Sequence, residues 1–368
     1  MDGRSGREGM GDMGVATWPE ADHLPPTEPR PTVRPPRPSP TPKGLRRLAS
    51  RLRPSWSSRL RRTLLALLVA TAVVAPVSAA ARPRIPAPPP APLAPPTPTT
   101  LRSTYEANRA NAAEAARMAD AHGDRSRAAT DRWLAAPTRR LLMFDGRGPG
   151  QAVEVLGDLL KADHLAVLVP GSDTSLDTYD RFHRAAQALH DRTGPDTAVI
   201  AWLGYETPGT ISTTVLTPTR AEQAAPHLRS FLRELRALVG DSAGLTVLCH
   251  SYGTVVCARA VTGLDDVDDV ALIGSPGTGA DSAAGLRTSA RVWAARGTED
   301  WIGTVPHTRA DLFGTTVGFG PDPTSSSFGA RVFTAGEAGH SGYFTPGSTS
   351  LENLAHITLG ARAEVSRA

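Results

Sequence analysis

The chain has 368 residues, a length that accommodates two average domains, but its 33 prolines and 34 glycines indicate that much of it is not packed core. The net charge of +4 is uneven: residues 1–62 contain 13 Lys and Arg against 6 Asp and Glu, so the remainder carries a net charge of −3. No basic patch with interleaved aromatic residues follows residue 62, which argues against a catalytic domain that binds nucleic acid.

Residues 1–62 are predicted to be a disordered, basic tail. Residues 1–43 are rich in Pro, Gly and Arg and show no periodicity. Residues 44–62 contain seven Arg and no acid, with apolar residues at spacings of three and four that Pro54 interrupts. This pattern indicates either a segment that lies on an anionic membrane surface or the long n-region of a signal peptide.

The uncharged segment 63–81 is predicted to be a signal peptide h-region or a transmembrane anchor. Its strongly apolar part, 64–74, is short for a spanning helix, and Val77–Ala81 resembles a small-residue cleavage site. On the other hand, a segment of about 20 residues can span a bilayer. Because arginines flank the segment, residues before 63 are expected to stay inside, and the following domain to be exported, either secreted or anchored to the cell membrane.

Two further segments precede the main domain. A Pro-rich linker is predicted at 82–100, extended and semi-rigid. A helical accessory segment is predicted at 101–140, because Leu101–Trp133 is rich in Ala, Glu, Arg and Met and is interrupted by Gly123. The weak apolar face of this segment indicates that it docks on the next domain.

From residue 141 to the C-terminus, strand candidates alternate with helical patterns. This alternation predicts an α/β fold, with a mostly parallel sheet covered by helices on both faces. The predicted strands are 164–169, 198–202, 245–248, 270–273, 290–294 and 330–333. Apolar helix faces lie between them at 176–189 and 228–238, and Gly240 is expected to end the second helix.

The stretch Leu245–Val256 has a strand, turn and helix pattern around the sequence His250-Ser251-Tyr252-Gly253. In an α/β-hydrolase such a turn is the nucleophile elbow, which exposes a serine hydroxyl above the sheet, so Ser251 is the candidate nucleophile. A common turn of Ser-x-Gly composition is the alternative. The first position of the signature, Gly in G-x-S-x-G, is Cys249 here.

Cys249 and Cys257 are predicted to be free and buried. Cys249 would end a strand and Cys257 would lie on the following helix, which is a poor geometry for a bridge.

The nucleophile needs a base and an orienting acid, which follow it along the chain in this fold. Asp300 is the candidate acid because it lies in the loop after strand 290–294, and His340 is the candidate base because it lies in the loop after strand 330–333. The alternatives are Glu299, Asp311 and Asp322 for the acid and His307 and His356 for the base. His250 is expected to be a packing residue turned away from Ser251.

An oxyanion hole is predicted from the backbone N–H groups of Ser172, in the loop Pro170-Gly171-Ser172, and Tyr252. An ordinary strand-ending turn is the alternative interpretation of this loop. Gly274–Gly279 lacks the Lys-Ser/Thr pair of a phosphate loop and is predicted to be a turn after a strand. No metal-ligand spacing occurs, so neither a metal nor a cofactor is expected.

Taken together, these segments resemble a family of largely uncharacterised bacterial α/β-hydrolases. The resemblance runs in order from about Leu141 to Gly360, and it includes the sequences around Leu141–Asp145, Ala166–Gly171, Ala201–Tyr205, His250–Gly253, Gly274–Gly277 and Gly339–Phe344. It implies a serine-hydrolase fold with Ser251, Asp300 and His340 at the matching positions. Cys249 departs from the pattern, because such proteins usually have Gly there.

We therefore expect an exported serine hydrolase, similar to an esterase or lipase, that cleaves a small-molecule or lipid ester through an acyl-enzyme. The alternatives are an acyltransferase that uses the same triad and a non-catalytic binding protein of the cell envelope with this fold. The loops 205–219 and 280–287 are candidates for a small lid.

Overall fold

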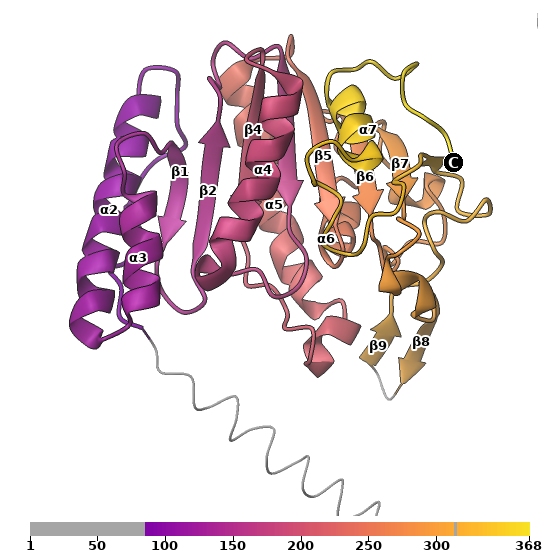
Figure 1. The fold of residues 1–368 in the computed structure, drawn as a ribbon, viewed down its shortest axis with the longest axis horizontal. Coiled ribbons are helices and arrows are strands. Elements are labelled where there is room, and N and C mark those ends of the chain that lie inside the picture. Colours follow the sequence, from indigo (N-terminus) through magenta and orange to yellow (C-terminus); the bar gives the residue numbers. More distant parts are fainter. Residues whose placement is uncertain (1–84, 313–314) are drawn as a thin grey trace, which may run out of the picture. The chain divides into compact units, whose positions relative to one another are not determined.

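A central sheet of eight strands organises the structure, a computed structural model that describes residues 85–312 and 315–368 (Figure 1). The spatial order is β1-β2-β4-β3-β5-β6-β7-β10. These strands are β1 (Leu141–Asp145), β2 (Gln151–Leu156), β3 (His164–Val169), β4 (Thr197–Leu203), β5 (Gly244–His250), β6 (Asp269–Ile273), β7 (Arg291–Ala295) and β10 (Arg331–Val332). Six neighbouring strands of this sheet run parallel, namely β4, β3, β5, β6, β7 and β10. At one edge, β2 pairs antiparallel with both β4 and β1.

The strands at the centre of the sheet are apolar along their whole length because both of their faces are covered. In β3, Leu165, Val167 and Val169 enter the apolar cluster on one face, and Ala166 and Leu168 enter the cluster on the other. This alternation follows from the two-residue period of a strand. The register of β3 against β5 pairs Val169 with Cys249, so both strands end at the same level.

Four helices cover the two faces of the sheet. They are α4 (Tyr179–Thr193), α5 (Thr219–Val239), α6 (Gly253–Ala260) and α7 (Thr349–Thr358). Leucines of α5 and valines of α6 pack on one face, and apolar residues of α4 and α7 pack on the other. Gly240 ends α5 with a positive φ of 80°, as its position after the apolar pattern predicts.

Two helices flank the antiparallel edge of the sheet, α2 (Leu101–His122) and α3 (Arg125–Leu134), which Figure 1 shows beside β1. Gly123 separates them with a positive φ of 92°. Ala112 and Ala115 of α2 pack with Leu141 and Phe144 of β1, so α2 docks on the sheet through small residues.

The described part of the Pro-rich segment, 85–100, contains no helix or strand and contacts α2 and the edge of the sheet. Ala87 packs with the cluster that contains Phe144, and Asn111 of α2 donates a side-chain hydrogen bond to the Pro89 carbonyl at 2.8 Å. Sequence composition alone does not reveal this contact of the Pro-rich segment with α2.

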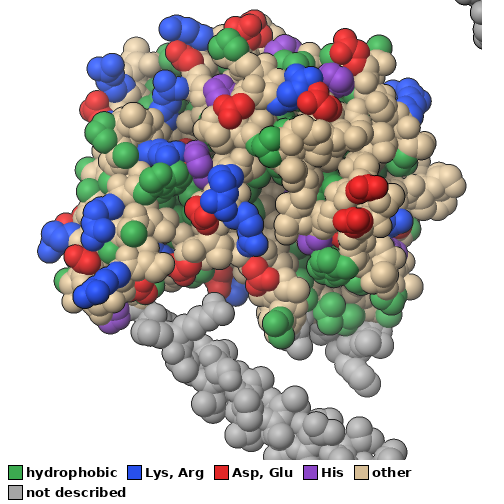
Figure 2. All heavy atoms as spheres, viewed as in Figure 1, with side chains coloured by type: hydrophobic (Ala, Val, Ile, Leu, Met, Phe, Trp, Pro, Cys, Tyr) green, Lys and Arg blue, Asp and Glu red, His purple; other side chains and the backbone are tan. Residues whose placement is uncertain are grey.

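A two-stranded hairpin, β8 (Arg309–Leu312) and β9 (Thr315–Gly318), stands apart from the main sheet. It lies in the long connection between β7 and β10. Figure 2 shows mixed acidic and basic side chains over the face in view, with hydrophobic side chains gathered toward the edge where Figure 1 places β8 and β9.

The structure confirms the predicted α/β-hydrolase fold and all six predicted parallel strands. The antiparallel strands β1 and β2 and the hairpin were not predicted as strands. Within residues 85–312 and 315–368, no helix is both long and apolar enough to cross a membrane. The tail at 1–62 and the predicted signal or anchor at 63–81 lie outside the described residues.

Candidate active site

The turn between β5 and α6 places Ser251 above the carboxyl end of the sheet. Ser251 has a φ of 54°, in the left-handed region that non-glycine residues seldom occupy. Its amide donates to the Ile273 carbonyl at the end of β6 (3.0 Å), and its carbonyl accepts from the Thr254 amide in α6 (3.0 Å). The strained backbone is therefore held by the neighbouring strand and by the following helix.

Two glycines allow the chain to cross itself closely at this turn. A Cβ on Gly253 would lie 2.6 Å from the Pro170 carbonyl oxygen, and a Cβ on Gly171 would lie 2.5 Å from the Ser251 Cβ. Neither backbone segment has room for a side chain. The loop after β3 consequently passes directly beside Ser251.

The prediction that Cys249 and Cys257 are free is wrong, because the two residues form a disulfide. Their Cα atoms are 6.4 Å apart, within the range that a disulfide bridges. The turn at Ser251 brings the first turns of α6 back over the end of β5, so the two positions approach each other. Both residues are fully buried, as predicted.

The structure brings His340 and Asp300 to Ser251. His340 Nε2 lies 2.9 Å from Ser251 Oγ, and His340 Nδ1 lies 2.8 Å from Asp300 Oδ1. Because a carboxylate only accepts, Nδ1 carries the proton and Nε2 is left to accept the serine hydroxyl proton.

Asp300 is buried and has several donors. Its Oδ1 also accepts from the Ile302 amide (2.9 Å), and Tyr343 donates its hydroxyl to Oδ2 (2.5 Å). Burial alone would raise the pKa of Asp300, but the hydrogen bonds from His340, Tyr343 and the Ile302 amide outweigh it and hold the pKa below its usual value. The carboxylate is therefore negatively charged at neutral pH.

The other acids and histidines considered for the triad lie elsewhere. Glu299 is exposed, and Asp322 pairs with Arg296. His307 Nε2 lies 3.2 Å from the Ser275 carbonyl, and His356 pairs with Glu364 at 3.4 Å. The side chain of Asp311 is outside the described residues.

His250 has a contact that the sequence did not reveal. Its Nε2 lies 2.6 Å from the His340 carbonyl oxygen, and the two rings are 4.9 Å apart. Burial, together with the neighbouring His340, lowers the pKa of His250 to about 4, so the ring is neutral at pH 7 and its Nε2–H donates to the carbonyl. His250 thus holds the loop that carries His340. Its position next to Ser251 is the one feature of the sequence that points to a place in the site.

The predicted oxyanion-hole residues, Ser172 and Tyr252, line the same cavity as Ser251. The loop of Ser172 is anchored by Tyr205, which donates its hydroxyl to the Pro170 carbonyl (2.7 Å), and by Asp173, which has a φ of 57° and accepts from the Thr210 amide (3.1 Å). These contacts fix the loop beside Ser251. The part that the two amides play in binding an oxyanion stays a prediction.

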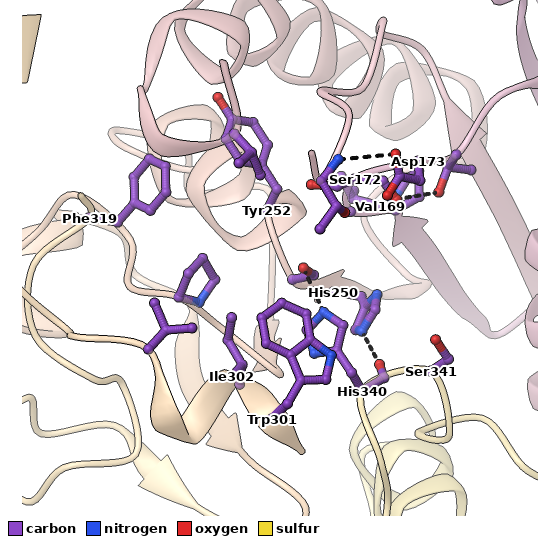
Figure 3. Close-up of a pocket in the computed structure, with 18 of the residues that line it drawn as sticks. Val169, Ser172, Asp173, His250, Tyr252, Trp301, Ile302, Phe319, His340 and Ser341 are labelled. Atoms are coloured by element: carbon purple, nitrogen blue, oxygen red, sulfur yellow. Dashed lines mark hydrogen bonds between the residues drawn. The ribbon is translucent and has the colours of Figure 1, made fainter. Parts of the chain in front are cut away.

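A cavity of about 630 Å³ opens over Ser251 and His340. In Figure 3, Phe319 and Ile302 lie on one side of the His250 and His340 pair, and Asp173 and Ser341 lie on the other. Of the two candidate lids, the loop 205–219 contributes lining residues, whereas 280–287 contributes none among the described residues.

Comparison with known proteins finds a family profile that matches part of the chain. Residues 145–310 match a family profile described as alpha/beta hydrolase. The uncharacterised protein Rv2079 of Mycobacterium tuberculosis is 32% identical over 249 residues, which cover 58% of this chain and 37% of that protein. The uncharacterised protein Rv0963c of the same species is 32% identical over 168 residues, covering 41% and 63%. The chain thus spans only part of each relative.

Solved structures of similar fold include two esterases. Esterase PE8 is 18% identical, with a TM-score of 0.39 and coverage of 56% of this chain and 96% of its own. A carboxylesterase from Mesorhizobium loti is 14% identical, with a TM-score of 0.35 and coverage of 57% and 95%.

Proposed function

Residues 145–310 match the profile of the alpha/beta hydrolase family, and on that premise we propose that the chain is a serine esterase with Ser251 as nucleophile, His340 as base and Asp300 as acid. The observation that carries the proposal is the continuous chain of contacts from Ser251 Oγ to His340 Nε2 (2.9 Å) and from His340 Nδ1 to Asp300 (2.8 Å). The strained φ of Ser251 supports it, because strain at a turn that points a hydroxyl into a cavity has a use in catalysis.

In the proposed reaction, Ser251 Oγ attacks the ester carbonyl carbon while His340 Nε2 takes its proton. The imidazolium that forms is stabilised by the ionised Asp300. His340 then gives the proton to the leaving alkoxide, so the alcohol departs and an acyl-serine remains. Water repeats the sequence on the acyl-serine and releases the carboxylic acid.

The oxyanion that forms in both steps would accept hydrogen bonds from the amides of Ser172 and Tyr252. The close passage of Gly171 beside Ser251 supports this placement, because it brings the following amide near the reacting carbon. A hole made of backbone groups needs no rearrangement during the reaction.

We infer also that the domain works outside the cytoplasm. The Cys249–Cys257 disulfide supports this, because structural disulfides persist in oxidising compartments. The uncharged segment 63–81, flanked by arginines, supports it independently. Fractionation of the producing cells, with sequencing of the mature N-terminus, tests the location and distinguishes a cleaved signal from an anchor.

Labelling by a fluorophosphonate probe tests the catalytic proposal. We expect the full-length protein to be labelled, Ser251→Ala to be unlabelled, and Ser341→Ala, which removes another serine hydroxyl that lines the cavity, to be labelled as the wild type is. A folded wild-type protein that resists the probe and hydrolyses no p-nitrophenyl acetate would contradict the proposal and favour a binding protein. Adding alcohols and analysing the products would reveal acyl transfer.

A further inference from the structure

We propose that the wall formed by residues 301–310 and 317–319 is a subsite for a long apolar chain, so that the substrates are esters of chains of about eight carbons or more. The apolar subsite is a property of the cavity itself. Only the statement that its ligand is a substrate rests on the proposed esterase function. It assigns a role to the connection between β7 and β10, which carries the hairpin outside the main sheet.

The chemistry of the wall is apolar. Apart from Gly318, eight residues of this wall line the cavity, and none of them bears a charge. Seven are apolar, namely Trp301, Ile302, Val305, Pro306, Ala310, Val317 and Phe319, and the eighth is Thr308. The only Asp and Arg among the residues that line the cavity are Asp173 and Arg181, outside this wall, and Figure 3 shows Asp173 on the side away from Phe319 and Ile302. A chain placed along the seven apolar residues would therefore lose contact with water without burying a charge.

The floor of the subsite is rigid and close to the nucleophile. The Phe319 ring packs edge-on against Tyr252, with 5.6 Å between centroids, and Tyr252 directly follows Ser251. The Phe319 carbonyl accepts from the Gly279 amide (2.7 Å), and a Cβ on Gly277 would lie 2.6 Å from the same oxygen. The backbone of Phe319 is thus fixed against the turn after β6, and the subsite begins beside the reacting atoms.

The hairpin supplies one side of the subsite with a matched pair of residues. Ala310 of β8 pairs with Val317 of β9, and both line the cavity. Paired residues of an antiparallel hairpin lie on the same face. One face of the hairpin therefore looks into the cavity, and the two side chains that it contributes to the lining are no larger than valine.

The apolar strip continues to the protein surface. Trp301 and Leu216 both line the cavity, yet 49% and 50% of their surfaces are exposed. Large apolar side chains at the mouth of a cavity offer contacts to a chain that is longer than the cavity itself. Each buried methylene contributes ~0.8 kcal/mol, which corresponds to about a fourfold gain in kcat/KM per methylene while the chain still meets the wall.

A chain-length series on the full-length protein tests the subsite. We expect kcat/KM to be at least about tenfold higher for p-nitrophenyl octanoate than for the acetate. Val317→Trp would place an indole in the part of the cavity that Val317 lines and abolish this preference, measured as the ratio of kcat/KM for the two esters. Ala310→Trp fills the same space from the paired strand and serves if Val317→Trp does not fold. Leu160→Trp, at an exposed leucine outside the cavity, is the matched control and should keep the preference.

Binding of 1-octanol, measured by isothermal titration calorimetry, needs no turnover and separates the two proposals. Octanol should bind to the wild type and to Leu160→Trp, and at least about tenfold more weakly to the folded tryptophan variants of the hairpin, because the occupied wall leaves fewer methylenes to bury. A preference for acetate, or an unchanged octanoate preference in both hairpin variants, would overturn the subsite while the esterase proposal stands. If no ester is hydrolysed and the probe does not label Ser251, the esterase proposal fails, and octanol binding alone then supports or overturns the subsite.

Discussion

Among the described residues, two buried carboxylates each contact a histidine and a tyrosine, and only one of the two histidines also contacts the proposed nucleophile. Asp300 meets His340 Nδ1 at 2.8 Å and the Tyr343 hydroxyl at 2.5 Å. Glu154 of β2 meets His183 Nδ1 at 3.0 Å and the Tyr179 hydroxyl at 3.1 Å. Burial would raise the pKa of Glu154 as well, but hydrogen bonds from His183 and Arg139 hold it below its usual value.

The difference lies at the second nitrogen of each histidine. His340 Nε2 faces Ser251 Oγ, whereas His183 Nε2 lies 3.2 Å from Nη1 of Arg139, a side chain that also pairs with Glu154 and stacks on Trp133. A guanidinium cannot give up its proton in a protein, so His183 Nε2 has no proton to accept from Arg139. The second cluster instead links α4 and the segment before β1 to Glu154 of the sheet. A carboxylate and histidine pair alone is therefore weak evidence of catalysis.

Removing the two histidines in turn gives the largest expected contrast. His340→Ala should lower kcat by about 10⁴-fold or more, because the serine loses its base, while His183→Ala should leave kcat for p-nitrophenyl acetate nearly unchanged and lower the melting temperature. Steady-state kinetics and thermal unfolding measure the two effects. Equal loss of kcat in two folded variants would contradict the distinction between the clusters.

Replacing Asp300 and Glu154 by their amides compares the two carboxylates, because each amide removes the negative charge and keeps the shape of the side chain. Asp300→Asn should lower kcat by about 10³ to 10⁴-fold, because an amide cannot stabilise the imidazolium. Glu154→Gln should instead lower the free energy of unfolding by ~3 kcal/mol, because the largely buried Arg139 loses its partner. Urea denaturation and kinetics on both variants provide the measurement, and an active Asp300→Asn enzyme would exclude Asp300 as the acid.

The contact from His250 to the His340 carbonyl is expected to matter less than the triad. His250→Phe keeps a ring but removes the donor, so we expect kcat to fall by about tenfold to a hundredfold as the His340 loop shifts. His250→Gln, which keeps a donor, should recover part of that loss. If both variants match the wild type in kcat, His250 is only a packing residue.

The lowered pKa of His250 also makes stability depend on pH. The folded value of about 4 lies below the ordinary 6.5, so the unfolded chain binds the proton more tightly and stability is lost as pH falls from 6.5 toward 4. This one group contributes at most ~3 kcal/mol across that window. Urea denaturation at pH 7 and at pH 4.5 should show a smaller difference for His250→Gln than for the wild type, and equal differences would show that the histidine is not buried as a neutral ring.

The smallest contrast concerns the two tyrosines. Tyr343→Phe and Tyr179→Phe each remove one hydroxyl donated to a buried carboxylate, and each should cost about 1 kcal/mol of stability. Only Tyr343→Phe should also change kcat, by a few-fold, because the Asp300 carboxylate then loses one of the hydrogen bonds that stabilise its negative charge. A larger kinetic effect of Tyr179→Phe would link the second cluster to the reaction.

Much of the fold could be predicted because the parallel strands are continuous apolar runs that end in turn residues. The strand that became β5, the turn at Ser251 and the helix after it were identified from periodicity and glycine placement. β2 was missed because it pairs antiparallel near the sheet edge, and its Glu154 interrupts the apolar pattern where a buried ion pair accommodates the charge. Pairing between strands that are far apart in the sequence leaves no local pattern from which it could be predicted.

The residues that the structure brings to Ser251 were found from their chain order and their places after predicted strands, and their catalytic roles stay predictions. What the sequence could not provide is contact across the site: the hydrogen bond from His250 to the His340 carbonyl, the hydroxyl of Tyr343 on Asp300, and the wall of residues 301–310 and 317–319. The error over Cys249 and Cys257 has the same origin. A strand end and a position on the next helix predict no bridge by themselves, because the sharp reversal at Ser251 that brings the two cysteines together has no local sequence signal.

The bridge between Cys249 and Cys257 closes a small covalent ring, and Ser251 is a member of that ring. A cut in the peptide chain between the two sulfurs would leave both fragments attached to each other. By restricting the denatured chain, a ring of this size contributes ~2–3 kcal/mol in the loop-entropy description. Ser251, on which the proposed chemistry depends, therefore keeps a restricted backbone even when the sheet around it is unfolded.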